Sequence, residues 1–499
     1  FVLATQNPIE QEGSLSLNET VFVNNHLKTG KELLSLAENG CIAEDKKGVK
    51  LYDVNAQTLT LNMDGKLEMQ KCFLYTLPYK DEMIAITTKT GKRIVVTKNH
   101  PFLVNENGVI TWKKAEELTK QDYLVNPARM PSVEQQKIMS HEEAISRMTQ
   151  KPMPKEISFD EDFAFWIGFV LSDGSIGKKH VEVTQKNYPE AIDRFVSVSK
   201  KYGFNPSMRT NRDCEYYARI YSKSLVEYLD IRFGIKGGKD KEIPSWFLSM
   251  PESMNREFLK TFISLESSLR DNRIVFTQKS LDNINLISYM LLREGIITWI
   301  RHDGRIYRLK IQGNDVITFL KNIGWISEEK IRTINLNRKI KSSFRVIPID
   351  KKSATKLVSL LGLDSFHTLK GRKKLTDRDW YGGYKGIKEG EIVMSVDSLQ
   401  KMVFEMEEEI SIRKKSDFAD NLTANPRFFA ASIGLPITEI AEQLNISRNQ
   451  IWNLYTKGVC IQETKIISYL KEQFSLRINE AESLLNYFKQ LLSKDIFYD

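Results

Sequence analysis

FWIGFVLSDGSIGKKHVEVTQK at residues 165–186 and FLKTFISLESSLRDNRIVFTQK at residues 258–279 repeat one pattern, and this repeat decides the fold of the middle of the chain. In each copy an apolar helical stretch ends in an acid, Asp173 or Glu266. A turn and a short strand ending in Thr-Gln-Lys follow, with the glutamine twelve residues after the acid in both copies. Two copies of one helix–strand–helix unit predict a pseudo-two-fold domain, in which the two acids meet near the axis.

Two facing carboxylates indicate a metal site. Their charges repel each other unless a cation lies between them, and hard oxygen ligands suit Mg²⁺. Lys186 and Lys279 follow the repeated glutamines, and Lys241 lies in KEIPSWF. Cations at these positions can stabilise negative charge that develops on a phosphate. The strands between the helices would form two twisted sheets that can enter the major groove of DNA. An alternative stays open, in which Asp173 only ends a core helix before a glycine turn.

The first copy carries a family motif. WIGFVLSDGSI resembles the motif of the LAGLIDADG homing endonucleases, with Gly168, Asp173 and Gly174 in place, and GIKGGKDKEIPSWFL resembles the segment before the second motif in intein-borne members. The resemblance implies a Mg²⁺-dependent double-strand DNA endonuclease over residues 159–330, with Asp173 and Glu266 as catalytic metal ligands. It also implies a basic-pocket role for Lys241. DNA-binding roles are assigned to Gln185, Lys186, Gln278 and Lys279.

The second copy departs from the motif. Thr261 stands where the family has Gly, Leu265 where it has a small residue, Glu266 where it has Asp, and Ser267 where it has Gly. Added volume at a tight helix contact typically costs about 1–3 kcal/mol and shifts the backbone. A DNA-binding protein that does not cut is therefore the alternative function.

The N-terminal part carries motifs of a second protein family. SLSLNETVFV, which begins at Ser14, and IVVTKNHPFLV resemble the splicing blocks of an intein with the Hint fold, here an all-β region over residues 14–130. The resemblance implies that Ser14 attacks the carbonyl of Gly13 and converts an amide into an ester. It also implies that Thr97 orients the scissile carbonyl and that His100 acts on the amide nitrogen.

The two ends of the chain are interpreted as parts of a larger context. FVLATQNPIEQEG resembles MoxR-type AAA+ ATPases, with Asn7 as the polar sensor, so residues 1–13 are expected to be the end of an N-extein. LLSKDIFYD resembles the strand with which such inteins return to the Hint domain, over residues 493–499, and none of the six histidines precedes an asparagine. We expect an intein fragment whose partners are the missing C-terminal intein segment, the exteins and the intein-less host gene. A MoxR-like ATPase is a further alternative, although the chain contains no GxxxxGK[ST] phosphate loop.

A helical module is expected near the C-terminus, over residues 426–492, after a linker at 131–158 and a basic accessory segment at 331–425. ITEIAEQLNISRNQIWNLYTKG predicts a helix-turn-helix, with Ala441 in the first helix, a turn at Asn445 and a second helix from Ser447. Simple packing of two helices is an equally open interpretation. The side chains predicted to face DNA are Arg448, Asn449, Gln450 and Asn453.

Composition agrees with a multidomain α+β protein. The chain has 499 residues, 41% of them hydrophobic, a net charge of +9 and a pI near 9.0, so a polyanion is a reasonable partner. No apolar run approaches the ~20 residues that a membrane helix needs. The four cysteines lie far apart without a CxxC pair, which predicts reduced thiols in the cytoplasm and argues against a local zinc ribbon.

Overall fold

The computed structural model divides the chain into two compact units, residues 1–103, 112–344 and 499 in one, and 104–111 and 345–498 in the other. None of the described helices combines the length and the hydropathy that a membrane crossing requires. The mixed α+β class predicted from the sequence is confirmed. The structure describes residues 2–4, 13–37, 40–44, 48–62, 64–106, 109–130, 157–210, 216–237, 241–270, 272–332, 345–364, 374–415 and 425–499.

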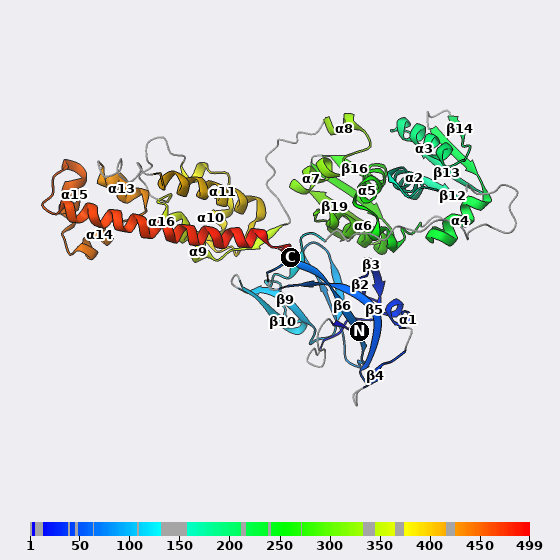
Figure 1. Ribbon diagram of the computed structural model, residues 1–499, viewed down its shortest axis with the longest axis horizontal. Coiled ribbons are helices and arrows are strands. Elements are labelled where there is room, and N and C mark those ends of the chain that lie inside the picture. The colour runs from blue at the N-terminus through cyan, green and yellow to red at the C-terminus, as the bar shows by residue number, and fades with distance from the viewer. Residues whose placement is uncertain are drawn as a thin grey trace. The chain divides into compact units, whose positions relative to one another are not determined.

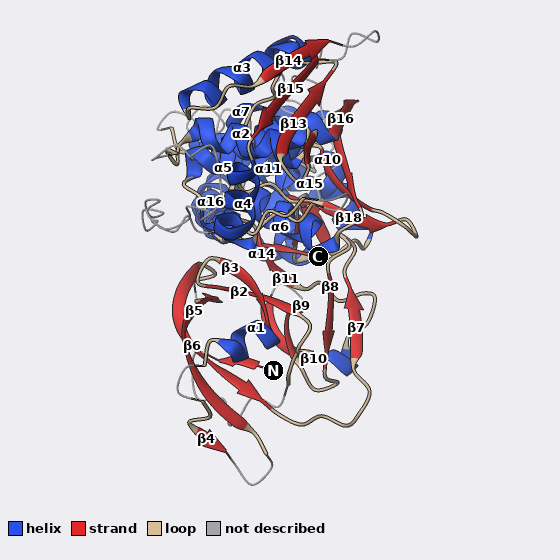
Figure 2. Cartoon of the chain, turned by 90° about the vertical axis from the view of Figure 1, so that its right-hand side faces the viewer, coloured by secondary structure: helices blue, strands red, loops and turns tan. Residues whose placement is uncertain are grey.

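The N-terminal part consists mostly of antiparallel strands, as Figure 2 shows. Its main sheet has the order β1-β6-β5-β2-β3 with β4 on β5, and β7 pairs with β8 in a separate hairpin. Alternating side chains of the long strands β5 and β6 are buried, such as Val54 and Leu74, which is the pattern of a sheet with one covered face. The elements are β1 Val2–Ala4, β2 Thr20–Val23, β3 His26–Thr29, α1 Gly30–Ser35, β4 Ala43–Glu44, β5 Lys50–Leu61, β6 Leu67–Thr76, β7 Ile84–Thr87, β8 Arg93–Val96, β9 Pro101–Glu106, β10 Val109–Lys114 and β11 Val125–Pro127.

The middle part contains two halves of the same design, each with the order αββαββα. Two sheets follow the same strand order, β12-β13-β15-β14 (the first sheet) and β16-β17-β19-β18 (the second sheet). One continuous hydrophobic core joins the halves around the neighbouring helices α2 and α5. The first half comprises α2 Glu161–Leu171, β12 Gly174–Ile176, β13 His180–Gln185, α3 Pro189–Lys201, β14 Ser207–Thr210, β15 Tyr216–Tyr221 and α4 Lys223–Phe233. The second half comprises α5 Glu252–Glu266, β16 Ser267–Arg270, β17 Arg273–Gln278, α6 Leu281–Arg293, β18 Trp299–His302, β19 Tyr307–Gln312 and α7 Asn314–Asn322, with α8 Glu328–Arg332 after it.

The second unit is mainly helical, and in Figure 1 the long helix α16 runs beside the shorter helices. Its interior holds a buried ionic cluster, in which Arg378 bonds Glu405 and Glu409 while Arg413 bonds Glu409. Within the accessory segment 331–425, whose architecture the sequence did not predict, the described residues 345–364 and 374–415 form helices and two short strands, with paired charges in the interior. The elements are β20 Val346–Pro348, α9 Lys351–Leu360, α10 Tyr381–Glu389, β21 Val393–Ser395, α11 Val396–Arg413, α13 Pro426–Ser432, α14 Ile437–Leu444, α15 Arg448–Lys457, α16 Glu463–Ser493 and β22 Ile496–Tyr498.

Candidate functional site

Helices α2 and α5 lead to the two acids and pack against each other. At their close contact α2 has a glycine, Gly168, whereas α5 has a threonine, Thr261. A β-carbon built on Gly168 of α2 would lie 3.3 Å from Cβ of Thr261 on α5, so the glycine leaves room for the threonine. The hydroxyl of Thr261 is buried and has no hydrogen-bond partner among the described residues. An unpaired buried hydroxyl destabilises a protein by about 1–3 kcal/mol. The threonine that replaces the motif glycine is thus accommodated, but at a cost in stability.

Asp173 follows directly on α2 and its cap residue Ser172. Gly174 has to be a glycine here, because a β-carbon would lie 2.3 Å from the carbonyl oxygen of Val170. The ammonium of Lys241 donates to three carbonyl oxygens at this helix end: Val170 at 3.0 Å, Ser172 at 2.8 Å and Gly174 at 2.6 Å. Lys241 therefore satisfies carbonyls that a helix end leaves without partners. Its charge also lies beside the acids.

The two acids and the lysine share one electrostatic environment. Burial raises the pKa of Asp173 to about 6, against the opposing charge of Lys241 and the hydrogen bond from Gln185. Burial raises the pKa of Glu266 to about 7, and the charge of Asp173 raises it further while Lys241 opposes it. Burial lowers the pKa of Lys241 to about 8, although both acids favour its charged form. The charges of both acids therefore act on Lys241, and the charge of Asp173 also acts on Glu266.

This donor set suits a metal that takes few protein ligands. Among the described residues, no three His, Cys, Asp or Glu side chains gather around a common point. Mg²⁺ is commonly held by one or two carboxylates together with substrate phosphates. Two desolvated carboxylates whose charges disfavour each other fit such an ion.

A cavity of about 550 Å³ opens beside this site. Its wall includes Lys241 and Glu266, and from the second half it includes Gln278 and Lys279. Lys279 and its counterpart Lys186 are both exposed. The repeat predicted four DNA-contacting residues. Three of them, Lys186, Gln278 and Lys279, are thus accessible to a ligand.

The fourth of these residues, Gln185, differs. It is 6% exposed, and its amide donates to the Asp173 carboxylate at 2.6 Å. Its side-chain oxygen accepts from the backbone amides of Lys186 at 2.9 Å and Asn187 at 2.8 Å. Gln185 lies on the inner side of β13 with Val181 and Val183, and so supports the acid from behind.

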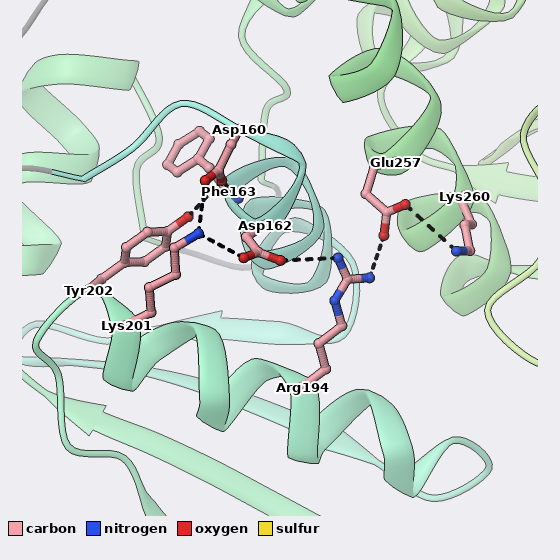
Figure 3. A network of polar contacts seen from close by, with 8 residues as sticks. All are labelled: Asp160, Asp162, Phe163, Arg194, Lys201, Tyr202, Glu257 and Lys260. Carbon is pink, nitrogen blue, oxygen red and sulfur yellow. Dashed lines mark hydrogen bonds and ion pairs between the residues drawn. The ribbon is translucent and has the colours of Figure 1, made fainter.

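A polar network ties the two halves at the opposite end of α2 (Figure 3). Arg194 of α3 bonds Asp162 of α2 and Glu257 of α5, so one guanidinium bridges both halves. Lys201 bonds Asp160 at 2.9 Å and Asp162 at 2.8 Å. These residues were not predicted from the sequence. They hold the N-terminal end of α2 in place, and Asp173 follows the other end of this helix.

The outer face of the second sheet concentrates positive charge. The four strands contain no acid, and the like charges Arg270 and Arg273 lie directly opposite each other on neighbouring strands, as do Arg301 and Arg308. Such pairs destabilise a sheet unless counter-charge is supplied. Asp303 supplies part of it, bonding Arg301 and Arg308 at 2.9 Å each, and Asp271 lies outside the described residues. The burial of Lys310, with the charge of Arg273, lowers its pKa.

The outer face of the first sheet is different. Arg219 bonds Glu182 there and also donates to the hydroxyl of Tyr221 at 2.9 Å. A hollow of about 270 Å³ lies on this face, lined by these three residues together with Arg209 and Tyr217 among others. The two sheets therefore offer chemically unlike surfaces.

Ser14 and Thr97, two of the predicted splicing residues, meet just after the end of β8. Ser14 and Thr97 are 3% and 1% exposed. The backbone N–H of Ser14 donates to Thr97 Oγ1 at 2.9 Å, and the backbone N–H of Thr97 donates to the carbonyl oxygen of Ser14 at 2.9 Å. The expected contact of Thr97 was with the Gly13 carbonyl. The structure instead places its hydroxyl on the nitrogen of the Gly13–Ser14 amide.

His100 lies against the same peptide bond. A β-carbon on Gly13 would lie 2.2 Å from Cα of His100, so only a glycine fits there without a shift of the backbone. Nδ1 of His100 is buried and has no hydrogen-bond partner among the described residues. Burial lowers the pKa of this imidazole to about 4, so it is neutral at pH 7. A neutral imidazole offers a base beside the Gly13–Ser14 peptide bond.

The candidate helix-turn-helix has the expected elements. Asn445 adopts the left-handed conformation that ends α14, with φ 52°, and Ser447 caps α15. Arg448, Asn449 and Asn453 are exposed on α15. Gln450 instead turns back, and its side chain accepts from the backbone N–H of Ser447 at 3.1 Å in a capping box.

An aromatic residue not identified from the sequence lies on the same helix. Trp452 is 49% exposed, and the guanidinium of Arg427 lies 5.6 Å from the centre of its ring. An exposed indole with a cation over it is a surface suited to nucleic-acid contact, and also to protein contact.

Comparison with known proteins identifies the family. The model of the intein splicing domain matches residues 20–412, which is most of this chain. A replication factor C small subunit of Methanocaldococcus jannaschii is 27% identical over 66% of this chain and 17% of its own length. Another from Thermococcus kodakarensis is 27% identical over 57% of this chain and 31% of its own length. This chain thus spans less than a third of either relative.

Solved structures of low similarity were also found. The homing endonuclease I-DmoI in complex with DNA and Mn is 18% identical, with a TM-score of 0.27, covering 33% of this chain and 96% of that chain. Full-length DUF199/WhiA from Thermatoga maritima is 14% identical, with a TM-score of 0.27, covering 64% of this chain and 94% of that chain.

Proposed function

This chain belongs to the intein splicing domain family, and we propose that its N-terminal part performs the first step of splicing while its middle part is a homing endonuclease. The observation that supports the splicing role is the pairing of Thr97 with the amide nitrogen of Ser14. The Hint fold and the roles of Ser14, Thr97 and His100 are part of this proposal.

The first step is an N-to-O acyl shift. The Ser14 hydroxyl oxygen bonds the Gly13 carbonyl carbon, the Gly13–Ser14 C–N bond breaks, and the hydroxyl proton ends on the nitrogen. The products are an ester and a free α-amine, so atoms and charge balance. His100, neutral at pH 7, would accept the hydroxyl proton, and Thr97 would hold the nitrogen that receives it.

The endonuclease proposal is supported by Lys241, which bonds the end of α2 that leads to Asp173 and shares a cavity wall with Glu266. Asp173 and Glu266 would hold Mg²⁺, which when bound neutralises charge on a phosphate and lowers the pKa of water. Lys241 would stabilise negative charge on the same phosphate, and Gln185 would keep the Asp173 carboxylate in place.

Double-stranded DNA is the proposed partner. The cations on the outer face of the second sheet suit phosphates, and arginines on a sheet face also suit guanine edges in the major groove. The α15 surface formed by Arg448, Asn449 and Asn453 would add a second contact region, as a helix-turn-helix does. Packing remains the alternative role of that helix pair.

One experiment tests the endonuclease. The chain is incubated with a plasmid carrying an uninterrupted gene for the host protein, with and without Mg²⁺, and cuts are mapped. We expect a Mg²⁺-dependent break at the insertion point. Binding of the plasmid without any break would instead support the second candidate, a DNA-binding protein that does not cut, which the buried unpaired hydroxyl of Thr261 favours.

The host stays a prediction. Its expected class is a MoxR-type ATPase, whereas the two relatives described above are replication factor C small subunits. The plasmid experiment therefore includes an uninterrupted gene of each class. ATP binding by the chain itself is not expected, since its sequence contains no GxxxxGK[ST] loop.

A further inference from the structure

The side chain of Asn283 hydrogen-bonds the backbone of residues 241–243 with both of its polar groups. Its oxygen accepts from the backbone N–H of Ile243 at 2.8 Å, and its amide donates to the carbonyl oxygen of Lys241 at 2.8 Å. Asn283 is 2% exposed and lies in the first turn of α6, where its own backbone N–H is capped by Ser280 at 3.2 Å. A buried carboxamide with two such bonds is fixed in orientation.

The backbone segment bound by Asn283 includes Lys241, the lysine beside the two acids. The ammonium of Lys241 is bound to the end of α2 in the first half, through the carbonyl oxygens of Val170, Ser172 and Gly174. The backbone of Lys241 is bound to α6 in the second half, through Asn283. Lys241 thus connects the two halves, and Asn283 is its attachment to the second.

The internal repeat shows that this contact is not shared by both halves. The equivalent helices α3 and α6 begin at Pro189 and Leu281, so the third position of α6, Asn283, corresponds to Ala191 at the third position of α3. Ala191 and Asn283 are both 2% exposed, so the position is buried in both halves. An apolar alanine meets the packing requirement in the first half, so the polar side chain of Asn283 answers a need found only beside Lys241.

We propose that Asn283 is a positioning residue, which sets where the Lys241 ammonium lies relative to Asp173 and Glu266. The consequence for rate rests on the proposed endonuclease function, whereas the placement of the lysine does not. A misplacement of about 1 Å in a reacting constellation can lower a rate by about a hundredfold. The loss should appear in the chemical step and not in DNA affinity, because Asn283 is buried.

Two variants and one control test the proposal. Asn283→Ala removes both bonds. Asn283→Asp is nearly isosteric and can still accept from Ile243, but an ionised carboxylate has no proton to donate to the Lys241 carbonyl. Glu190→Ala, at an exposed position in the first turn of α3, is the surface control. Thermal unfolding of each variant is recorded, and all rates are measured well below the lowest unfolding temperature.

The first readout is the reactivity of the lysine itself. Each protein is treated briefly with acetic anhydride at pH 8, and acetylation of Lys241 relative to the exposed Lys186 is measured by mass spectrometry. In both Asn283 variants we expect the acetylation of Lys241 relative to Lys186 to change at least about tenfold, because displacement of the amine alters both its accessibility and the fraction of it that is deprotonated at pH 8. Glu190→Ala should match the wild type.

The second readout is single-turnover cleavage with Mg²⁺, beside DNA affinity measured with Ca²⁺. We expect the cleavage rate to fall at least about tenfold in both Asn283 variants, with the dissociation constant within about twofold of the wild type. Unchanged Lys241 reactivity in folded Asn283 variants would overturn the proposal. If the wild type does not cut but Lys241 reactivity changes in the variants, the endonuclease proposal fails and the positioning role stands.

Discussion

Ser14 and Thr97 exchange two hydrogen bonds: each donates its backbone N–H at 2.9 Å, one to the hydroxyl and the other to the carbonyl oxygen of its partner. This pairing holds the nitrogen of the Gly13–Ser14 bond against a hydroxyl that can both accept and donate a hydrogen bond. A small perturbation of this nitrogen should therefore change the acyl shift more than it changes the fold.

Thr97→Val is expected to slow the shift at least about tenfold, because the variant keeps the shape of the side chain and loses its hydroxyl. The unpaired Ser14 amide should also lower the free energy of unfolding by about 1–3 kcal/mol. The measurement is release of residues 1–13 by hydroxylamine, which cleaves esters. Thr97→Ser is the control and should release at nearly the wild-type rate, whereas Ser14→Ala should release nothing. A wild-type rate in Thr97→Val would exclude the hydroxyl from the reaction.

Glu266→Gln should stabilise the metal-free protein at pH 8 and leave it unchanged near pH 4. The pKa of Glu266 rises from its ordinary 4.5 to about 7 in the folded state, so folding favours the protonated acid. The ionised acid therefore lowers stability, a penalty that is absent below pH 4.5, grows through pH 7 and is complete above it. Calorimetry in chelator at both pH values measures this, with exposed Glu190→Gln as the control. A lower unfolding temperature for Glu266→Gln at pH 8 would contradict it.

Asp173→Asn should abolish cleavage while DNA affinity stays within about threefold of the wild type, because the change removes one anionic ligand and no phosphate contact. Cleavage is followed on supercoiled plasmid with Mg²⁺, and affinity by fluorescence anisotropy with Ca²⁺. A variant that cuts at the wild-type rate would remove Asp173 from the proposed metal site.

Arg448→Ala should weaken DNA binding and reduce the slope of log K against log salt by about one, because one phosphate contact is lost. Gln450→Ala is the informative comparison on the same helix. Its side chain caps α15, so we expect a loss of about 0.5–2 kcal/mol in stability with no change in the salt slope. Equal salt slopes for Arg448→Ala and the wild type would favour packing as the role of this helix pair.

Local patterns in the sequence predicted the repeat well. The equal spacing from acid to glutamine anticipated two halves with one strand order and helices that end at the acids. Two further signals were present but not used. Gln185 follows Val181 and Val183 at alternate positions of β13, and both valines are buried. Alternate residues of a strand face the same side, which indicates that the Gln185 side chain points inward. Ser447 and Gln450 form the S-x-x-Q pattern of a capping box.

The contacts that place Lys241 had no such signal. Its ammonium bonds carbonyls about 70 positions earlier, as the separations of 71, 69 and 67 residues show, and its carbonyl bonds Asn283, 42 residues later. Backbone carbonyls are present at every residue, so no sequence pattern marks those that a lysine will find. Arg194 likewise reaches Glu257 across 63 residues, a pairing that only the packing of α2, α3 and α5 decides.

The unlike outer faces of the two sheets have a consequence for the proposed target. In an assembly of two identical chains, both halves would present the same side chains, and the duplex would have to read alike from either strand. Here one chain encodes both halves, with directly opposed arginines on one face and, on the other, a hollow that includes Glu182, which bonds Arg219. A duplex that satisfies both faces needs no palindrome, and its binding has a fixed direction along the DNA.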